Sequence, residues 1–273
     1  MISDWLIQHE NTLRLSCFFS LFISMAIWEQ YAPRKTLTTS KTTRWLNNIA
    51  LTFLNTLLLR LIFPLTAVSL ALQLETHNIG LLPRLFLPDW LTIILTIILL
   101  DLAIYWQHRL FHQIPLCWRL HRMHHADTDI DVTTGARFHP LEIILSMLIK
   151  FLIILIMGIP AVAVLLFEII LNGMAMFNHS NIKLPQRWDN RLRQLFVTPD
   201  MHRVHHSVLE TEMNSNFGFN LAIWDRIFNS YQAQPTAGHE EMLIGLDKFR
   251  EAKYLTLPYL LWLPVADIKK FEK

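Results

Sequence analysis

Histidine is concentrated in three short segments of this chain. In one-letter code they read HRLFH, HRMHH and HRVHH, and they contain eight of the 13 histidines: His108, His112, His121, His124, His125, His202, His205 and His206. Neutral imidazole is the commonest metal ligand in proteins. Eight imidazoles exceed the roughly four to six ligands that one ion takes, so the count predicts two metal ions.

The spacing within each segment suits an α-helix. The histidines of HRLFH are four residues apart, and those of each HxxHH segment fall at i, i+3 and i+4, so each set lies on one helical face. A pair at i, i+4 can hold one ion, and the i+3 member can reach a second ion close by. Pro115 separates the first two segments, and Thr198 or Asp200 is expected to cap the helix of the third, next to Pro199. No segment has the H-E-x-x-H motif of zinc proteases.

A polar stripe precedes the first histidine segment. Asp101, Tyr105, His108 and His112 are spaced 4, 3 and 4 residues apart and share one helical face. An ionisable residue inside an apolar helix is costly and usually has a functional partner. We therefore predict that Asp101 accepts a hydrogen bond from a ligand histidine, with Tyr105 beside it. The alternative is that Asp101 reaches the membrane surface.

A second stripe comprises Glu168, Asn172 and His179, which are 4 and 7 residues apart. His179 is a candidate ninth ligand, the alternative being a hydrogen-bonded structural histidine. His139, before Pro140, could bind metal, support a ligand or contact substrate. Four side chains besides Asp101 are expected to support the site from behind: Tyr105, His139, Asn172 and Asp200. The remaining histidines are predicted to be surface residues: His9, His77 and His239.

Apolar stretches dominate the rest of the chain. Hydrophobic residues make up 52% and charged residues only 17%, against about 25% charged in an average soluble domain. Stretches at about 13–31, 49–72 and 90–106 are each long enough to cross roughly 30 Å of hydrocarbon. A fourth, at about 141–177, is long enough for two crossings bent at Gly158–Pro160. A soluble helical core is the weaker alternative, because 91–100 has only Thr92 and Thr96 as polar side chains.

The predicted fold is therefore all-α: an integral membrane bundle of four to five helices with a histidine-rich helical cap. The first stretch lacks the basic start and cleavage site of a signal peptide. Short loops rich in Lys and Arg face the cytoplasm, and the loop after the first stretch carries Arg34, Lys35, Lys41 and Arg44. Counting spans from there places all three histidine segments on the cytoplasmic side.

The chain reads as one membrane domain over 1–273, with N-terminal spans at 1–90, the histidine region at 91–232 and a tail at 233–273. The tail's apolar run at 255–265 is too short to span and should lie on the membrane surface or pack on the cap. A net charge of +2 without a Lys/Arg block argues against nucleic acid as a partner. Two cysteines cannot form a disulfide framework.

An all-nitrogen site suits iron, zinc or copper. Two such metals near a bilayer surface could activate O2 against an aliphatic C–H bond of a lipid, which zinc alone cannot do because it has no redox chemistry. The same histidines would also serve a metal carrier or sensor, or a zinc-dependent lipid hydrolase.

From about Leu100 to Tyr231 the sequence resembles the fatty acid hydroxylase/sterol desaturase superfamily. The resemblance rests on the three histidine segments and on four further motifs: Arg137-Phe-His-Pro140, Phe177-Asn-His-Ser-Asn181, Thr198-Pro-Asp-Met-His202, and Asn216-Phe-Gly followed by Trp224-Asp-Arg-Ile-Phe228. It implies a non-haem di-iron monooxygenase or desaturase whose catalytic iron ligands are the eight segment histidines, joined by His179. Zinc would be a substituted metal.

The resemblance also implies a lipid substrate and O2 as co-substrate. The sequence encodes no four-cysteine iron–sulfur pattern and no G-x-G-x-x-G motif, so electrons are expected from a separate reductase, ferredoxin or cytochrome. Which lipid is modified, and whether by hydroxylation or desaturation, stays open.

Overall fold

The computed structural model describes residues 2–266. Within this range the chain is all-α, with no β-sheet and only three isolated β-bridges between extended segments. Five segments are long and apolar enough to cross a membrane, which confirms the predicted helical membrane bundle. They are Glu10–Tyr31, Lys41–Thr76, Asp89–Gln113, Pro140–Met157 and Ala161–His179.

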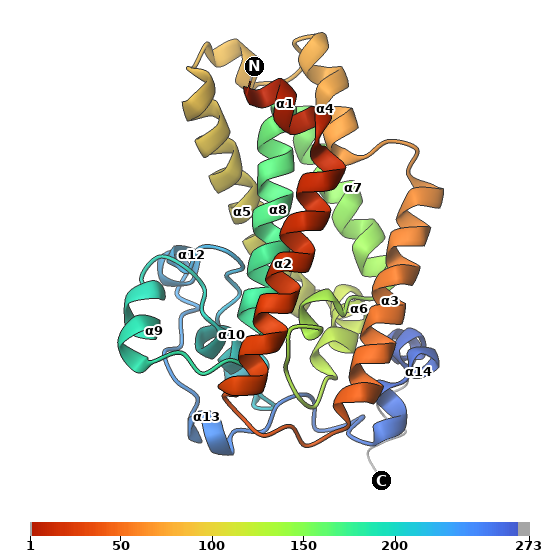
Figure 1. The fold of residues 1–273 in the computed structure, drawn as a ribbon, viewed down its shortest axis with the longest axis vertical. Helices are drawn as coiled ribbons and strands as arrows, with labels where there is room; N and C mark the ends of the chain where they lie inside the picture. Colours follow the sequence, from red (N-terminus) through yellow and green to blue (C-terminus); the bar gives the residue numbers. More distant parts are fainter. Residues whose placement is uncertain (1, 267–273) are drawn as a thin grey trace.

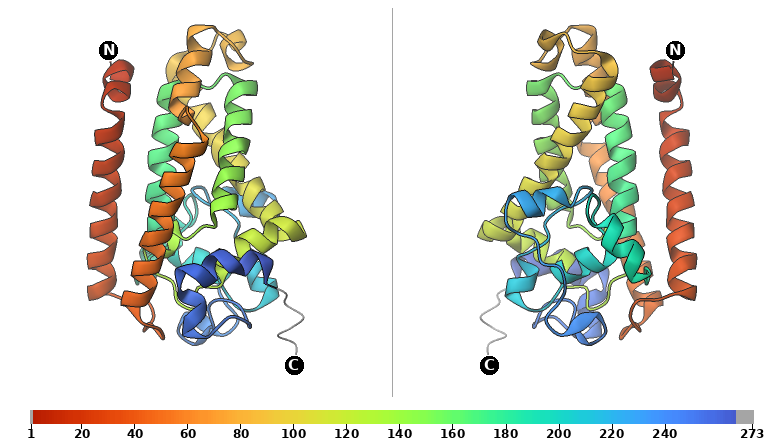
Figure 2. Two further views of the ribbon diagram at one scale, coloured as in Figure 1. Left: turned by 90° about the vertical axis from the view of Figure 1, so that its right-hand side faces the viewer. Right: turned by 90° about the vertical axis from the view of Figure 1, so that its left-hand side faces the viewer.

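The long helices run alongside one another, and most of the short helices gather at the end opposite the N-terminus, while α1 and α4 lie at the N-terminal end (Figures 1 and 2). The bundle contains α1 (Ile2–Gln8), α2 (Glu10–Tyr31), α3 (Lys41–Ile62), α4 (Ala67–Thr76), η1 (Leu82–Leu85), α5 (Asp89–Gln113), α7 (Pro140–Met157) and α8 (Ala161–His179). The other end, called the cap here, contains α6 (Pro115–His125), η2 (Thr134–Ala136), α9 (Gln186–Leu192), α10 (Pro199–His205), α11 (Glu210–Met213), α12 (Ile223–Ile227), α13 (Gly238–Glu241), η3 (Ala252–Leu255), α14 (Leu257–Trp262) and η4 (Leu263–Val265).

The second apolar stretch is not one continuous helix. Phe63 is extended and ends α3, as expected for a residue that precedes proline. The predicted hairpin near 158–160 is confirmed: α7 ends at Gly158, whose φ is +63°, and α8 starts after Pro160. A Cβ on Gly158 would lie 2.2 Å from the carbonyl oxygen of Ile79, so this close approach requires glycine.

A buried apolar core joins α4, α5, α7 and α8, with Leu100, Ile154 and Phe167 at its centre. Large apolar side chains also cover the outside of the spans, as at Phe53 and Leu61. A helix satisfies its own backbone hydrogen bonds, which allows such surfaces to face hydrocarbon.

Segments near both ends of the chain pack on the cap. The backbone N–H of Arg34, just after α2, donates to the carbonyl of Asn181 at 2.7 Å. In the tail, the carbonyls of Leu263 and Ala266 accept hydrogen bonds from the Arg122 guanidinium of α6. The short apolar run of the tail therefore packs on the cap, which was one of the two predicted arrangements.

Candidate metal centre

Nine histidines converge where α5, α6, α8 and α10 meet in the cap. They form two groups, and within each group one ring nitrogen of every histidine lies within 4.8 Å of the others. The first group is His108, His112, His121, His125 and His205, and the second group is His124, His179, His202 and His206.

The division into groups follows the helical spacing. On α6 the i, i+4 pair, His121 and His125, belongs to the first group, and the i+3 member, His124, belongs to the second. On α10 and its C-cap residue, the i, i+4 pair, His202 and His206, belongs to the second group, and the i+3 member, His205, belongs to the first. His125 and His206 stack at 4.5 Å between ring centroids, so the two groups are adjacent.

Local sequence signals start both cap helices that carry histidines. Pro115 occupies the first turn of α6, where its missing N–H costs nothing. Thr198 caps α10: its hydroxyl accepts a hydrogen bond from the Met201 N–H at 3.3 Å and donates to Asp189 at 2.6 Å. Thr198, not Asp200, is therefore the cap.

Five of the nine rings are oriented by a hydrogen bond from Nδ1. Because carbonyl and carboxylate oxygens only accept hydrogen bonds, each of these Nδ1 atoms carries the proton and leaves its lone pair on Nε2. The pairs are His108 with Phe217 O (2.8 Å), His121 with Glu142 Oε1 (2.7 Å), His124 with Arg137 O (3.0 Å), His179 with Ala175 O (2.7 Å) and His205 with Ser215 O (2.8 Å).

The second group has the donor arrangement of a metal site. The Nε2 atoms of His124 and His179 are 3.1 Å apart, and both carry lone pairs. Nε2 of His202 lies 2.9 Å from Nε2 of His179 and 3.2 Å from Nε2 of His206. Lone pairs at this distance repel unless a cation lies between them. Metal–nitrogen bonds of about 2.0–2.1 Å place neighbouring ligands about 3 Å apart, so these residues fit a metal ion.

The first group fits a metal for a different reason. Nε2 of His121 and of His205, and both ring nitrogens of His112 and His125, are buried without a hydrogen-bond partner. A buried polar atom without a partner costs about 1–3 kcal/mol. A cation bound by these nitrogens would remove that cost.

The environment keeps the cap histidines neutral. Burial lowers the pKa of His205 to about 3 and holds the pKa values of His124 and His202 well below 6.5, and neighbouring histidines contribute to the shift. Neutral imidazole is the form that binds metal, so the groups need no proton release near neutral pH.

Asp101 does not contact a histidine, so that prediction is wrong. It is only 1% exposed, which also excludes the alternative that it reaches the membrane surface. Its oxygens accept hydrogen bonds from the N–H groups of Asn220 and Leu221 and, at 2.8 Å, from Nε1 of Trp224. The loop needs an acceptor for these three donors, and the carboxylate supplies it.

Tyr105 and His139 also lie outside both groups. The Tyr105 hydroxyl bonds to the Ser230 hydroxyl at 2.8 Å. Nδ1 of His139 accepts from the Leu141 N–H at 3.2 Å, so His139 caps α7. Both residues stabilise the surrounding structure.

Asn172 and Asp200 occupy other environments than expected. Asn172 is exposed on α8, one turn from Glu168, whose carboxylate pairs with Arg14 and Lys150. Asp200 pairs with Arg34 at 3.0 Å and lies 3.7 Å from His239. His239, predicted to be a surface residue, is only 5% exposed, so that prediction is wrong.

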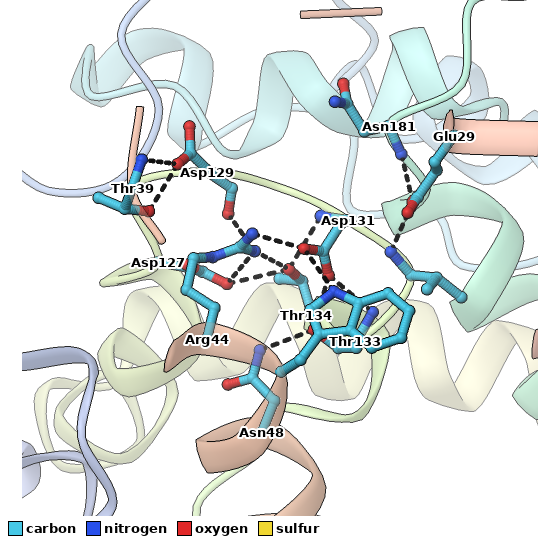
Figure 3. A network of polar contacts seen from close by, with 12 residues as sticks. Glu29, Thr39, Arg44, Asn48, Asp127, Asp129, Asp131, Thr133, Thr134 and Asn181 are labelled. Carbon is cyan, nitrogen blue, oxygen red and sulfur yellow. Dashed lines mark hydrogen bonds and ion pairs between the residues drawn. The ribbon is translucent and has the colours of Figure 1, made fainter. Parts of the chain in front are cut away.

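Two features beside the histidines were not predicted from the sequence: the acceptor of His121 and a buried polar network next to the second histidine segment. Glu142, two residues after Pro140, is buried against His121. Alternating acids Asp127, Asp129 and Asp131 follow directly after the second histidine segment, and all three are buried in a polar network (Figure 3). Acids at fixed positions beside candidate ligands were the signal that could have revealed both features.

The histidines of the two groups are shielded from solvent to different degrees. Eight of the nine histidines are buried, and His112 is partly exposed. The rings of Trp118 and Phe217 lie 4.9 Å and 5.2 Å from its ring. His112 is therefore the member of the two groups that lies nearest the protein surface.

The chain is similar to known lipid enzymes. The fatty acid hydroxylase family model matches residues 93–230, which include all nine clustered histidines. Ornithine lipid hydroxylase OlsE from Rhizobium tropici is 25% identical over 173 residues, covering 63% of this chain and 51% of the relative. Human alkylglycerol monooxygenase is 27% identical over 151 residues, covering 54% of this chain and 31% of the relative. Very-long-chain aldehyde decarbonylase GL1-7 from Oryza sativa subsp. japonica is 27% identical over 185 residues, covering 62% of this chain and 29% of the relative.

The chain thus spans about half or less of the length of these relatives. No solved structure matches it. The family match extends over half of the 273 residues and contains both histidine groups. The chain therefore belongs to the fatty acid hydroxylase family.

Proposed function

We propose that this protein is a membrane di-iron oxygenase that hydroxylates or desaturates an aliphatic C–H bond of a lipid, using O2 and electrons from a separate donor protein. One observation carries the proposal: nine imidazoles meet in two adjacent groups, and the Nε2 lone pairs of His124 and His179 face each other. This arrangement has no purpose in a purely structural core, because uncompensated lone pairs destabilise it.

Iron is the metal that suits both the ligands and the family. Nitrogen-only sites accept iron, zinc or copper, and zinc can occupy such a site without redox activity. Relatives named hydroxylase and monooxygenase favour a redox metal. Two iron ions, one in each group, would supply the O2 activation that breaks an unactivated C–H bond.

The residues of this chain would hold the metal ions, orient the ligand histidines and shield the site from water. Backbone carbonyls and Glu142 fix the tautomers of five rings, so their Nε2 atoms are aimed before metal binds. Phe138 lies flat on His124 at 4.5 Å, and Phe217 lies within 5.7 Å of His108. These apolar rings exclude water from the site, which protects reactive species from side reactions.

The lipid approaches the first group from the turn between α5 and α6. Here His112 is partly exposed, and the apolar side chains of Leu110, Ile114 and Leu116 are exposed around the turn, Leu116 at 70%. Trp118, two residues after Leu116, packs against His112 with 4.9 Å between ring centroids. An acyl chain in the bilayer can follow that surface to the metal ligands.

We further propose that the cap faces the cytoplasm. Arg34, Lys35 and Lys41 lie at the cap end of the bundle, between α2 and the start of α3. Basic residues in short loops favour the cytoplasmic side. Arg44, counted with them in the sequence, is instead buried in an ion pair with Asp127. A cytoplasmic cap is accessible to soluble electron donors.

The test is metal content combined with O2 use. Purified protein loaded with ferrous iron should hold about two irons per chain and consume O2 only when a reductant is supplied. Stoichiometric iron without O2 uptake under any donor would contradict the proposal. Lipid turnover that continues without O2 would indicate a zinc hydrolase, and metal flux into proteoliposomes would indicate a carrier.

A further inference from the structure

A buried polar stripe runs along α3, in the N-terminal part of the chain that the family model does not match. Arg44, Asn48 and Asn55 are 4 and 7 residues apart, share one helical face, and are at most 7% exposed. Burying such groups is costly unless each has a partner. The partners show what the stripe does.

Arg44 binds the segment 127–138, which connects α6 to α7. Its Nε and Nη2 donate to the two oxygens of Asp127 at 2.7 Å and 2.9 Å, and its Nη1 donates to Asp131 at 2.5 Å (Figure 3). Its Nη2 also reaches the Thr134 hydroxyl at 3.1 Å. A fully buried arginine with two carboxylate partners fixes this segment strongly.

The two asparagines bind the same segment. Asn48 Nδ2 donates to the Thr133 hydroxyl at 3.0 Å, and Asn48 Oδ1 accepts from Arg137 Nη1 at 3.2 Å. Asn55 Nδ2 donates to the carbonyl of Phe138 at 2.8 Å. α3 therefore holds the segment 127–138 along its whole length.

That segment in turn contacts the second group. The carbonyl of Arg137 accepts from Nδ1 of His124, and the ring of Phe138 stacks on His124 with an interplanar angle of 10°. At η2, a Cβ on Gly135 would lie 2.6 Å from the carbonyl of Ala175, which is the acceptor for Nδ1 of His179. The segment thus orients two of the four second-group histidines: His124 directly, and His179 through the carbonyl that packs against Gly135.

The first group touches this segment only through the longer stacking contact of His121 with Phe138, at 6.3 Å between ring centroids, and its Nδ1 acceptors lie elsewhere. Nδ1 atoms of its members bond to Phe217, Ser215 and Glu142, none of which lies in the segment 127–138. A change in the segment should therefore reach the two groups unequally.

We propose that Asn48, together with Arg44, is a positioning residue for the second group, so that one of the two metal sites depends on the N-terminal spans. The inference rests on the proposed two-metal function. Loss of groups that orient ligands typically weakens metal binding about 10- to 100-fold. The structure assigns the larger part of that loss to the second group, two of whose ligands take their Nδ1 acceptors from this segment or from the carbonyl packed against it.

The primary variant is Asn48→Leu, which keeps the side-chain size but cannot bond to Thr133 or Arg137. The matched control is Asn47→Leu on the same helix. Asn47 instead donates to the carbonyl of Thr43 and accepts from the N–H of Leu257, outside the segment. After loading with ferrous iron and removal of weakly bound metal, Asn48→Leu should hold about one iron per chain and Asn47→Leu about two.

Double variants identify which site is lost. His206→Ala removes a second-group ligand, so Asn48→Leu with His206→Ala should still hold about one iron. His205→Ala removes a first-group ligand, so Asn48→Leu with His205→Ala should hold almost none. If Asn48 had only a general structural role, Asn48→Leu would lower the iron occupancy of both sites, and the two double variants would hold the same amount of iron.

Gly135→Ala tests the same segment from its other side, and keeps the proposal testable if Asn48→Leu does not fold. The added methyl group must displace the Ala175 carbonyl, so this variant should also hold about one iron and lose it when combined with His205→Ala.

If both Asn48→Leu and Gly135→Ala held two irons per chain, the inference about Asn48 would be wrong, while the proposed two-metal function would stand. Equal loss from the two sites, seen as no iron in Asn48→Leu with His206→Ala, would overturn the inference in the same way. A wild-type protein that does not hold two irons would contradict the proposed function and this inference with it.

Discussion

Nδ1 of His121 donates to Oε1 of Glu142 at 2.7 Å, with both side chains almost fully buried. The other four Nδ1 contacts in the two groups go to backbone carbonyls. A carboxylate is the strongest acceptor of the five, so Glu142 fixes the His121 tautomer and would increase the donation of His121 Nε2 to a bound metal ion.

Replacing Glu142 should weaken the first site. Glu142→Leu should lower its iron affinity about 10- to 100-fold, whereas Glu142→Gln, whose amide oxygen can still accept, should have a smaller effect. Titration with iron against a competing chelator measures this. Glu241→Gln, an exposed acid of the cap, is the control. Equal affinity in Glu142→Leu and in the control would remove Glu142 from the site.

Replacing Asp101 should affect stability before metal content. In Asp101→Asn one carboxylate oxygen becomes an amide NH2 group. In one orientation this group faces the N–H donors of Leu221 and Trp224, and in the other it faces the N–H of Asn220. Leaving a buried donor unpaired costs about 1–3 kcal/mol, so the thermal unfolding midpoint should fall while iron content stays near two. Loss of iron at an unchanged midpoint would restore the original prediction that Asp101 supports a ligand.

Much of the site could be predicted because helical periodicity is a local property. The spacing of His121, His124 and His125 fixes which ring points to which group, and Gly158 and Pro160 fix the hairpin between α7 and α8. These features depend on neighbours within one or two turns. The structure confirms the spans and brings His179 into the second group.

The remaining features depend on contacts distant in sequence. The sequence predicts that Asp101 supports a ligand histidine, but in the structure Asp101 accepts hydrogen bonds from Asn220 and Trp224, which lie 119 and 123 residues further on. The pairing of Arg44 with Asp127 joins residues 83 apart and reverses the interpretation of Arg44 as a loop charge. A single sequence can mark such acids as unusual, but it does not show which distant residue each of them pairs with.

Trp118 should influence where the lipid is oxidised. Its ring stands 4.9 Å from His112 at the partly exposed side of the first group. Trp118→Ala should admit chains in new positions and change the distribution of products several-fold, while iron content stays near two, because substrate position controls which C–H bond reacts.

Mass spectrometry of the lipid products measures this distribution. Trp188→Ala, on an exposed position of α9, is the matched control. An unchanged product pattern in Trp118→Ala would place the lipid path elsewhere.

Acid should destabilise the metal-free protein. The folded pKa of His205 is about 3, below its ordinary value of 6.5, so the unfolded chain binds the extra proton between these values. Stability is therefore fully present above about pH 6.5 and is lost as the pH falls towards 3. Burial raises the pKa of Asp225 to about 6, which acts in the opposite direction, but the several buried histidines outweigh one carboxyl group.

The unfolding midpoint of metal-free protein, measured at neutral and at mildly acidic pH, checks this. It should be lower in acid, and His77→Ala, far from both groups and exposed, should show the same dependence as wild type. A midpoint that rises in acid would contradict the neutral state of the clustered histidines.

Isotope labelling tests whether this protein uses O2 to oxidise a lipid. Cells that produce the wild-type chain or His205→Ala are grown under O2 labelled with the heavy oxygen isotope, and their lipids are compared by mass spectrometry. We expect cells with the wild-type chain, but not cells with His205→Ala, to contain a lipid that has gained one labelled oxygen atom or lost two hydrogen atoms. A product that forms equally with His205→Ala, or without O2, would contradict the proposed function.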